Sequence, residues 1–197
     1  MRISLIKNLM LPEIFNQKDV LVTGHTGFKG SWLSAWLSQF GANIIGISDR
    51  VPTNPAHYEL IKSRIDQDHR IDVKDSKNIL DIIGDIKPRF IFHLAGQPIV
   101  LESYDNPLNT FYTNTLGTAN VLDALRRTNH ECNAVMITSD KCYDNVEWTY
   151  GYREMDRLGG KDPYSGSKGA AELVIRSYVE SFFKKPGSNV RIAVGRA

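Results

Sequence analysis

The chain has 197 residues, the size of one domain large enough to bury a core, and its 42% hydrophobic and 23% charged residues are typical of a soluble globular protein. Its formal net charge of +2, without a basic run interleaved with aromatic residues, gives no indication of a nucleic-acid partner. No apolar run approaches the ~20 residues of a membrane span, and Lys7, Asn8 and Glu13 interrupt the apolar residues before Phe15, so we expect a cytoplasmic protein with no membrane partner.

The first predicted strand, residues 20–22, leads into Thr-Gly-His-Thr-Gly-Phe-Lys-Gly at residues 23–30, and a helical pattern of apolar residues follows. Strand, tight turn and helix in this order direct free backbone N–H groups and the positive end of a helix dipole at one point, which suits a pyrophosphate. In this reading the first glycine permits the turn, the second lets the phosphates approach and the third lets helix and strand pack closely. We therefore predict a dinucleotide site that includes Gly24, Thr26, Gly27, Phe28, Lys29 and Gly30. For His25 we expect loop packing, with phosphate contact as the alternative.

The second predicted strand, residues 43–48, places Asp49 at its tip, about twenty residues after the glycines. A carboxylate at this place can accept hydrogen bonds from both ribose hydroxyls, although Asp49 could also be a solvated loop acid. The neighbouring Arg50 can hold a 2′-phosphate instead. Both NAD and NADP are therefore open, and we favour NAD.

Strands and helices continue to alternate along the rest of the chain. The predicted elements are a helix at 58–65, a strand near 70–71 leading into Asp72-Val73, a helix at 76–86 capped by Ser76, a strand at 90–94 ending in Ala95-Gly96, a helix at about 109–127, a strand at 134–138, a loop at 144–163, a helix at 164–183 and a strand at 190–194. On the helix at 109–127 we expect Leu116, Ala119, Leu122 and Leu125 to form the buried stripe. Cys132 and Cys142 lack metal-ligand spacing, so we expect packing residues and no metal site.

Alternating βαβ units predict an α/β fold with a doubly wound parallel sheet of the Rossmann type. We assign residues 18–197 to this dinucleotide-binding domain and residues 1–17 to an N-terminal extension. Ligands of such sheets lie beyond the carboxyl ends of the strands. The glycine segment, Asp49, Asp72, Ala95-Gly96 and Ser139-Asp140-Lys141 all follow predicted strands, so they are expected to share one edge of the sheet.

Tyr164 and Lys168 are four residues apart and therefore share one face of a predicted helix. A phenol has a pKa near 10, too high for a base at neutral pH, but a nearby ammonium and a bound nicotinamide cation would lower it. Such a pair suits the removal of a sugar hydroxyl proton. The alternative is an amphipathic helix with a half-buried tyrosine and a solvated lysine.

The glycine spacing and the tyrosine–lysine pair together resemble the extended branch of the short-chain dehydrogenase/reductase superfamily. The resemblance implies that Asp72 and Val73 hold the adenine and that Leu94, Ala95, Gly96 and Thr113 lie with Tyr164 and Lys168 beside the nicotinamide half. Read by themselves, Asp72 could be a helix cap and Thr113 a polar helix position.

A closer resemblance is to the CDP-D-glucose 4,6-dehydratases, and it covers the chain from about Lys18 onward. It rests on residues 23–32, 93–98, 138–143, 147–148 and 151–154, and on the stretch from there to Glu172. The most specific part is Ser139-Asp140-Lys141, because the related dTDP-glucose dehydratases carry Thr-Asp-Glu at this place.

This resemblance implies conversion of CDP-D-glucose to CDP-4-keto-6-deoxy-D-glucose with NAD, in deoxysugar and O-antigen (lipopolysaccharide) biosynthesis. Tyr164, tuned by Lys168, would take the 4-hydroxyl proton while hydride passes from C4 to NAD and later returns to C6. Lys141 would remove the C5 proton, Asp140 would protonate the departing 6-hydroxyl, and Ser139 would hydrogen-bond the 4-oxygen. Without the resemblance, Ser-Asp-Lys is equally an ordinary turn.

Members of this family continue for nearly as long again, with a C-terminal substrate domain, so we expect an incomplete sugar-nucleotide site and uncovered apolar surface. Leu101 stands where the family usually has arginine, and Gly166 where it has a larger residue. A catalytically inactive NAD-binding module is therefore one alternative. A sugar-nucleotide epimerase or reductase is another, against which Lys141 argues. A homodimer through the helices near Asn109 and Tyr164 is usual in the superfamily.

Overall fold

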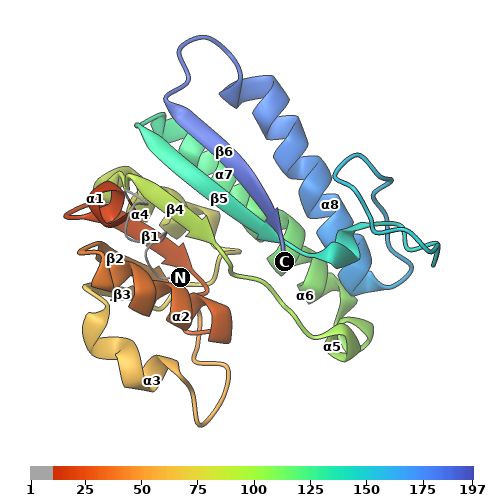
Figure 1. Cartoon of the computed structure of the whole chain (residues 1–197), viewed down its shortest axis with the longest axis horizontal. Helices are drawn as coiled ribbons and strands as arrows, with labels where there is room; N and C mark the ends of the chain where they lie inside the picture. The colour runs from red at the N-terminus through yellow and green to blue at the C-terminus, as the bar shows by residue number, and fades with distance from the viewer. Residues whose placement is uncertain (1–10) are drawn as a thin grey trace, which may run out of the picture.

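The computed structural model describes residues 11–197, which form six parallel strands in the order β3-β2-β1-β4-β5-β6 with helices around them (Figure 1). The strands are β1 (Asp19–Thr23), β2 (Asn43–Ile47), β3 (Gln67–His69), β4 (Phe90–His93), β5 (Cys132–Thr138) and β6 (Val190–Arg196). The strand order reverses between β1 and β4, the place where such sheets bind dinucleotides. The predicted doubly wound parallel fold is confirmed.

The described residues also form eight α-helices, of which the first precedes β1, and four short 3-10 or π segments. They are α1 (Leu11–Phe15), α2 (Phe28–Gln39), α3 (Tyr58–Ile61), η1 (Lys62–Arg64), α4 (Ser76–Ile86), α5 (Val100–Asp105), α6 (Pro107–Phe111), η2 (Tyr112–Leu116), α7 (Gly117–Thr128), η3 (Asp140–Cys142), α8 (Pro163–Tyr178) and η4 (Val179–Phe183). None of the helices in residues 11–197 is long and apolar enough to cross a membrane.

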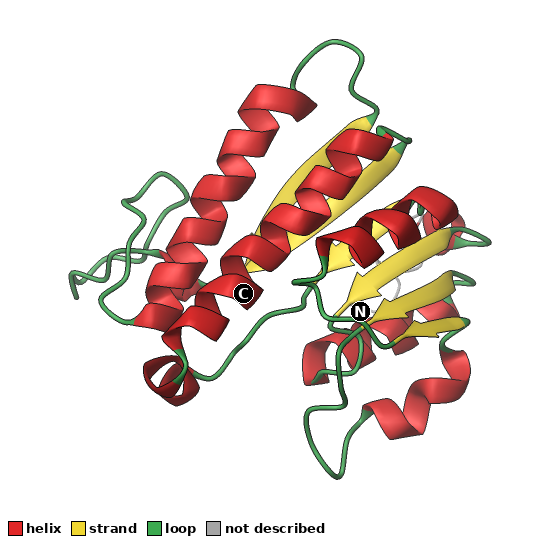
Figure 2. Ribbon diagram, turned by 180° about the vertical axis from the view of Figure 1, so that it is seen from behind, coloured by secondary structure: helices red, strands yellow, loops and turns green. Residues whose placement is uncertain are grey.

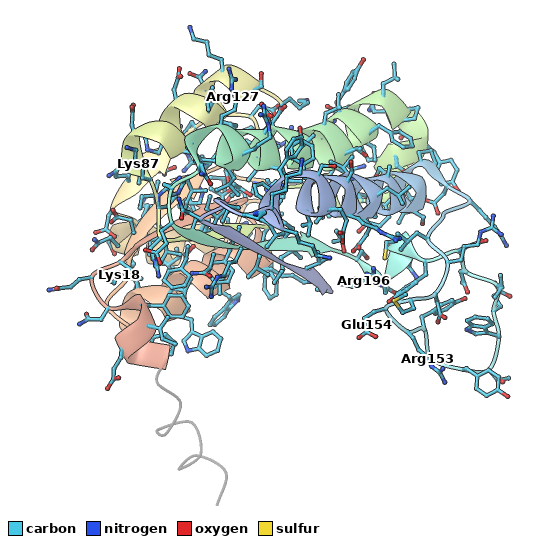
Figure 3. All side chains as sticks on the ribbon, turned by 90° about the horizontal axis from the view of Figure 1, so that it is seen from above. Lys18, Lys87, Arg127, Arg153, Glu154 and Arg196 are labelled. Atoms are coloured by element: carbon cyan, nitrogen blue, oxygen red, sulfur yellow. The ribbon has the colours of Figure 1, made fainter. Side chains whose placement is uncertain are left out.

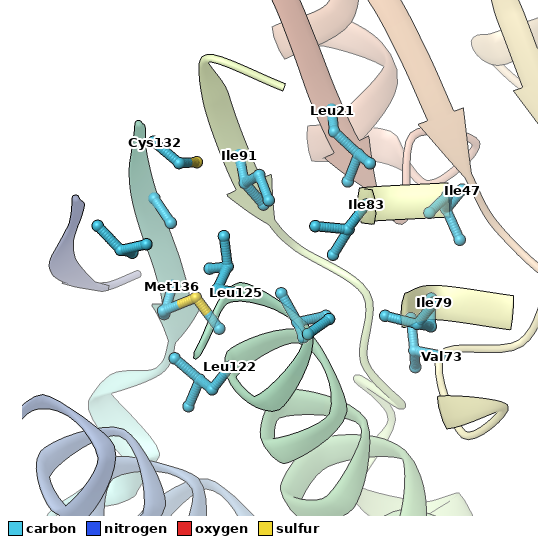
Figure 4. Close-up of a cluster of buried hydrophobic side chains, with 14 of the residues drawn as sticks. Leu21, Ile47, Val73, Ile79, Ile83, Ile91, Leu122, Leu125, Cys132 and Met136 are labelled. Atoms are coloured by element: carbon cyan, nitrogen blue, oxygen red, sulfur yellow. The ribbon is translucent and has the colours of Figure 1, made fainter. Parts of the chain in front are cut away.

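The two faces of the sheet are covered unequally. Helices α4, α7 and α8 cover one face (Figure 2), and their apolar residues form the larger core with β1, β4 and β5 (Figure 4). Helices α1 and α2 cover β1 and β2 on the other face, where Phe15 packs 4.8 Å from Phe90, ring centre to ring centre. On that second face no described helix lies over β5 and β6 (Figure 1).

Strand β1 is buried on both sides because successive side chains point to opposite faces. Val20 and Val22 pack with α1 and α2, whereas Leu21 packs with the core under α4 and α7. The end of β1 is thereby fixed at the centre of the sheet. Of the predicted N-terminal extension, residues 1–10 lie outside the described residues, and its boundary at residue 17 stays a prediction.

The third strand and the cap of α4 differ from the prediction. The third strand is Gln67–His69 rather than residues 70–71, because the polar edge strand β3 pairs with β2 on one side only and carries no apolar alternation. The cap of α4 is Asp75 rather than Ser76, since the Asp75 carboxylate accepts a hydrogen bond from the Asn78 N–H at 3.1 Å.

The predicted helix at 109–127 is divided into α6, the π-helical turn η2 and α7. A π turn contains extra backbone for each hydrogen bond, so it shifts the phase of the side chains around the helix. The expected stripe is therefore wrong at Leu116, which is about half exposed, and only partly met at Ala119. Leu122 and Leu125 are buried as predicted.

Helix α2 meets the sheet through small residues. Gly30, Ser31, Ser34 and Ala35 are buried, while Trp32 and Trp36, which contributed to the helical pattern, are both about half exposed. A side chain at Gly30 would overlap the carbonyl oxygen of Gly24, so this glycine permits the close approach of helix and loop.

We predict that Gly30→Ala lowers the free energy of unfolding by about 3 kcal/mol or more, because the new methyl group forces α2 away from the loop. Ser34→Ala on the same helix is the matched control. Its Oγ is buried without a hydrogen-bond partner in the described part of the chain, so we expect no loss of stability. Urea denaturation of both variants measures the difference, and equal losses would contradict the assigned contact.

Candidate active site

The glycine segment is held against the ends of β2 and β4. Gly24 has a positive φ of 73°, and its N–H donates to the Ile47 carbonyl at 2.7 Å. A Cβ at Gly24 would lie 2.8 Å from the Ala95 nitrogen, so the loop and the turn after β4 are in direct contact. Only glycine meets both conditions at this position.

The start of α2 is open toward a ligand. Gly27 is its N-cap and provides no side-chain cap, so the first N–H groups of the helix remain available. A Cβ at Gly27 would meet only the Gly24 carbonyl oxygen, at 3.3 Å, which leaves space in front of the loop. These features fit the diphosphate of a dinucleotide.

Asp49 and Arg50 form an exposed turn beyond β2, and the Arg50 Nε lies 4.0 Å from the Asp49 carboxylate. The Thr26 hydroxyl donates to the Arg50 carbonyl at 2.6 Å and so joins this turn to the glycine segment. The structure thus brings both candidate ribose-binding residues to the loop.

The next turn, after β3, is closed by Asp72. Its carboxylate accepts from the Lys74 N–H at 2.9 Å and lies 3.2 Å from the Lys74 ammonium. Val73 is buried in the core and packs against Gly117.

A buried histidine that the sequence prediction did not use holds the turn after β4. His93 lies between two hydroxyls, with Nδ1 at 2.8 Å from Thr23 and Nε2 at 3.1 Å from Thr118. The Thr118 hydroxyl already donates to the Asn114 carbonyl, so we assign the proton of His93 to Nε2 and the acceptor role to Nδ1. The Thr23 hydroxyl accepts in turn from the Ala95 N–H at 3.1 Å. Burial lowers the pKa of His93 to about 3, which keeps the ring neutral.

The π turn η2 carries Asn114, a second buried polar residue that connects separate segments of the chain. Asn114 is buried, accepts from the Gln97 N–H at 2.8 Å, and donates to the Gln97 carbonyl and to the Ser167 hydroxyl. It therefore connects the loop after β4 to α8. Thr113, beside it, is partly buried. In the sequence Asn114 was only a polar helix position.

Tyr164 and Lys168 lie on the first turns of α8, which is capped by the Asp162 carboxylate. Tyr164 is buried, and the Lys168 Nζ lies 6.0 Å from the centre of its ring. A Cβ at Gly96 would lie 3.3 Å from the same Nζ, so the lysine is directed at the turn after Leu94 and Ala95 rather than into solvent. Burial, with a smaller contribution from the charge of Lys29, lowers the pKa of Lys168 to about 8. Lys168 thus lies beside the turn at residues 94–96 that the glycine segment also contacts.

Ser139, Asp140 and Lys141 follow β5 at the same edge of the sheet. The buried Ser139 hydroxyl donates to the Asp140 carboxylate at 2.9 Å and accepts from the Lys141 N–H at 3.3 Å. The Lys141 Nζ lies 3.7 Å from the Asp140 carboxylate, and the two side chains are 56% and 71% exposed. Lys141 and Asp140 face a cavity of about 930 Å³, whose wall also includes Ser165, directly after Tyr164.

The loop at 144–162 forms the other wall of this cavity and is attached by Arg196. The guanidinium forms a two-point ion pair with the buried Glu172 carboxylate on α8 and also donates to the Tyr143 hydroxyl and the Glu154 carbonyl (Figure 3). Hydrogen bonding to Glu172 raises the pKa of Arg196. Tyr152 stacks on Tyr143, with 5.0 Å between the ring centres.

The remaining predictions concern single residues. Cys132 and Cys142 are free and buried, as expected for packing residues, and burial raises their thiol pKa values to about 12 and about 11. His25 is fully buried in the loop, which confirms its packing role. Leu101 is largely exposed on α5, and a Cβ at Gly166 would make an ordinary contact with Phe111. Within residues 11–197 there is no cluster of three or more His, Cys, Asp or Glu that could hold a metal.

We predict that Lys168→Met raises the free energy of unfolding by about 1–3 kcal/mol at pH 7, since it removes a partly buried charge. Below about pH 8 the lysine is protonated in both states and the full cost of its burial is present. Between about pH 8 and 10.5 the unfolded chain binds more protons than the folded chain, so the wild type gains stability with rising pH and the difference shrinks. Thermal unfolding of both proteins from pH 7 to 10.5 measures this, and a difference that stays constant with pH would refute it.

The comparisons with known proteins agree with this geometry. The sequence model of the GDP-mannose 4,6 dehydratase family matches residues 21–191. CDP-glucose 4,6-dehydratase of Salmonella typhimurium is 45% identical over 181 residues, which are 91% of this chain and 50% of that protein. GDP-mannose 4,6-dehydratase of Vibrio cholerae is 27% identical over 84% of this chain and 47% of that protein. The chain spans about half the length of these curated relatives.

Solved structures show the same fold. Pal from Bacillus thuringiensis superposes with a TM-score of 0.77 and 28% identity over 90% of this chain and 55% of that chain. MoeE5 in complex with UDP-glucose and NAD superposes with a TM-score of 0.72 and 25% identity over 90% of this chain and 53% of that chain. The chain belongs to the GDP-mannose 4,6 dehydratase family, within the extended short-chain dehydrogenases/reductases.

Proposed function

We propose that this chain is the dinucleotide-binding half of a CDP-D-glucose 4,6-dehydratase and carries its catalytic side chains. The observation that carries the proposal is that α8 directs Lys168, beside Tyr164, at the turn that also touches the glycine segment. Ser139, Asp140 and Lys141 lie at the same edge of the sheet. The 45% identity to CDP-glucose 4,6-dehydratase supports this substrate among the sugar nucleotides. The resemblance also supports a place in deoxysugar and O-antigen synthesis.

The group that fits the glycine segment is NAD. When bound, NAD supplies a hydride acceptor and later a hydride donor to the sugar. The open N-terminus of α2 and the space at Gly27 suit its diphosphate, and Asp49 suits its ribose hydroxyls. Arg50 at the same turn leaves NADP as the alternative.

Tyr164 acts first in this proposal, as the base for the proton of the sugar 4-hydroxyl. Its neighbour Lys168 stabilises the phenolate through its positive charge. Because the pKa of Lys168 is about 8, this residue can also exchange a proton with solvent near neutral pH. Ser139 hydrogen-bonds the 4-oxygen and orients the sugar.

In this proposal Asp140 and Lys141, which follow β5, carry out the elimination of water. A 4-keto group makes the C5 proton acidic. When the proton of the pair is on the Asp140 carboxyl, the neutral Lys141 amine removes the C5 proton while Asp140 gives its proton to the 6-hydroxyl, which leaves as water. The 3.7 Å between the Lys141 ammonium and the Asp140 carboxylate allows them to act on neighbouring carbons of one sugar. A lysine must lose its ammonium proton before it can act as a base, whereas a glutamate is already ionised at neutral pH. Lys141 is therefore the distinctive residue of this site.

The second candidate function is a dinucleotide-binding module without catalytic activity, and the exposure of the Asp140 and Lys141 side chains favours it. We expect isothermal titration calorimetry to show NAD binding, and CDP-glucose to yield a 4-keto product that absorbs in strong base. NAD binding without product would favour the module. Binding of neither compound would refute both readings.

We further propose a homodimer formed through α6, η2 and α8. Leu108, Phe111, Tyr112 and Leu116 are exposed on the first two elements, and Leu173 is exposed on α8. These apolar residues suit pairing with a second copy.

The role of Lys141 predicts a separation of two steps in a chain that turns over CDP-glucose. We expect Lys141→Ala to stop water elimination while oxidation at C4 continues, because only the removal of the C5 proton is lost. The absorbance of reduced cofactor reports the first step and the base-absorbing product reports the second. Lys161→Ala, at the wall of the same cavity, is the control and should leave both steps within about threefold. Equal loss of both steps in Lys141→Ala would contradict the assigned role.

A further inference from the structure

The imidazole of His25, within the glycine segment, is fully buried. Its ring lies against Gly46 of β2, where a Cβ would overlap the ring atoms. Tyr58 of α3 meets the ring edge-on, with 5.5 Å between the ring centres and 84° between the planes. The side chain of His25 therefore fixes the loop against strand β2.

Both nitrogens of His25 are hydrogen-bonded. Nε2 lies 3.1 Å from the Asp68 carboxylate on β3, and Nδ1 lies 3.1 Å from the Ser48 hydroxyl after β2. A carboxylate only accepts, so we assign the proton to Nε2 and let Nδ1 accept from Ser48. Burial lowers the pKa of His25, which agrees with a neutral ring. The Asp68 carboxylate also accepts from the Tyr58 hydroxyl at 2.5 Å and from Arg70 at 2.7 Å.

This chain of hydrogen bonds reaches the backbone that would hold the cofactor. The Ser48 hydroxyl accepts from the Thr26 N–H at 3.4 Å, and the Thr26 side chain donates to the Arg50 carbonyl. The loop on one side and the Asp49–Arg50 turn on the other are thus fixed relative to the same imidazole. A dinucleotide would touch the first with its phosphates and the second with its ribose.

Packing alone does not explain these choices of residue. An apolar side chain would fill the same space without the cost of burying two polar nitrogens. Strand β2 also carries glycine at position 46 to admit the ring, although glycine in a strand interior weakens the strand. His25 and Gly46 therefore preserve the hydrogen bonds of the imidazole although they lower local stability. This is expected of a group that positions a binding site.

We propose that His25 is a positioning residue for the adenosine half of the dinucleotide. His25 sets the distance between the glycine segment and Asp49, and this distance determines the preference for NAD, whose ribose 2′-hydroxyl is free, over NADP. The proposal rests on the dinucleotide site of the proposed function.

The test is calorimetric binding of NAD, NADP and ADP-ribose to the whole chain. We expect His25→Leu to weaken NAD and ADP-ribose about tenfold each, and NADP less than threefold, so that the preference for NAD falls. Leu37→Ala is the matched control, because it removes a buried side chain of α2 that is outside this chain of hydrogen bonds. It should lower the melting temperature and leave all three affinities within twofold.

Two further variants keep the proposal testable if His25→Leu does not fold. His25→Asn retains an acceptor for Ser48, and His25→Gln retains a donor for Asp68, so each should lose about threefold for NAD. Unchanged affinity and preference in all three variants, or equal affinity of the wild type for NAD and NADP, would overturn the inference. A wild type that binds none of the three ligands would overturn the proposed function itself.

Discussion

The structure depends on the contact between the glycine segment and the turn after β4. Gly24 touches the backbone of Ala95, and Gly96 touches the ammonium of Lys168, so three segments distant in sequence meet without intervening side chains. A Cβ at Gly24 would clash with the backbone of Ala95, and a Cβ at Gly96 would press against the Asn114 and Lys168 side chains. The Thr23–His93–Thr118 hydrogen bonds fix the same contact from inside the sheet. The position of Lys168 at this contact follows from the start of α8, which the Asp162 carboxylate caps.

The same packing explains why Lys168 lowers the stability of the fold. Lys168 lies in a partly buried place beside another ammonium-bearing residue, Lys29, and its pKa is lowered accordingly. Packing alone would favour an apolar residue here, and a partly buried lysine with a lowered pKa suits the role proposed for Lys168. His93 differs from Lys168 in this respect, because both of its nitrogens have partners and its neutral form is stable in place.

The sequence predicted what local periodicity and short spacing encode. The glycine segment, the tyrosine–lysine pair and the alternation of strands and helices depend on residues a few positions apart, and the structure has them. Strand β3 was misplaced because Gln67–His69 is polar and pairs on one edge only. The predicted buried stripe of the helix at 109–127 was wrong at Leu116, because the π turn η2 rotates the side chains to a different face of the helix. No residue pattern predicts that turn. The partners of His93, Asn114 and Arg196 lie up to 70 residues away, so only the folded chain could show them.

The uneven cover of the sheet divides the candidate site into two halves. Tyr164 and Lys168 lie on the first turns of α8, where Tyr164 is buried and Lys168 is partly buried. Asp140 and Lys141 are more than half exposed, next to β5 and β6, whose second face has no described helix over it (Figure 1). Exclusion of water favours the neutral form of an amine, which is the form that can accept a proton. We infer that the surroundings of Tyr164 and Lys168 are ordered by the described residues, whereas Asp140 and Lys141 lie at an open cavity bounded by the loop that Arg196 holds.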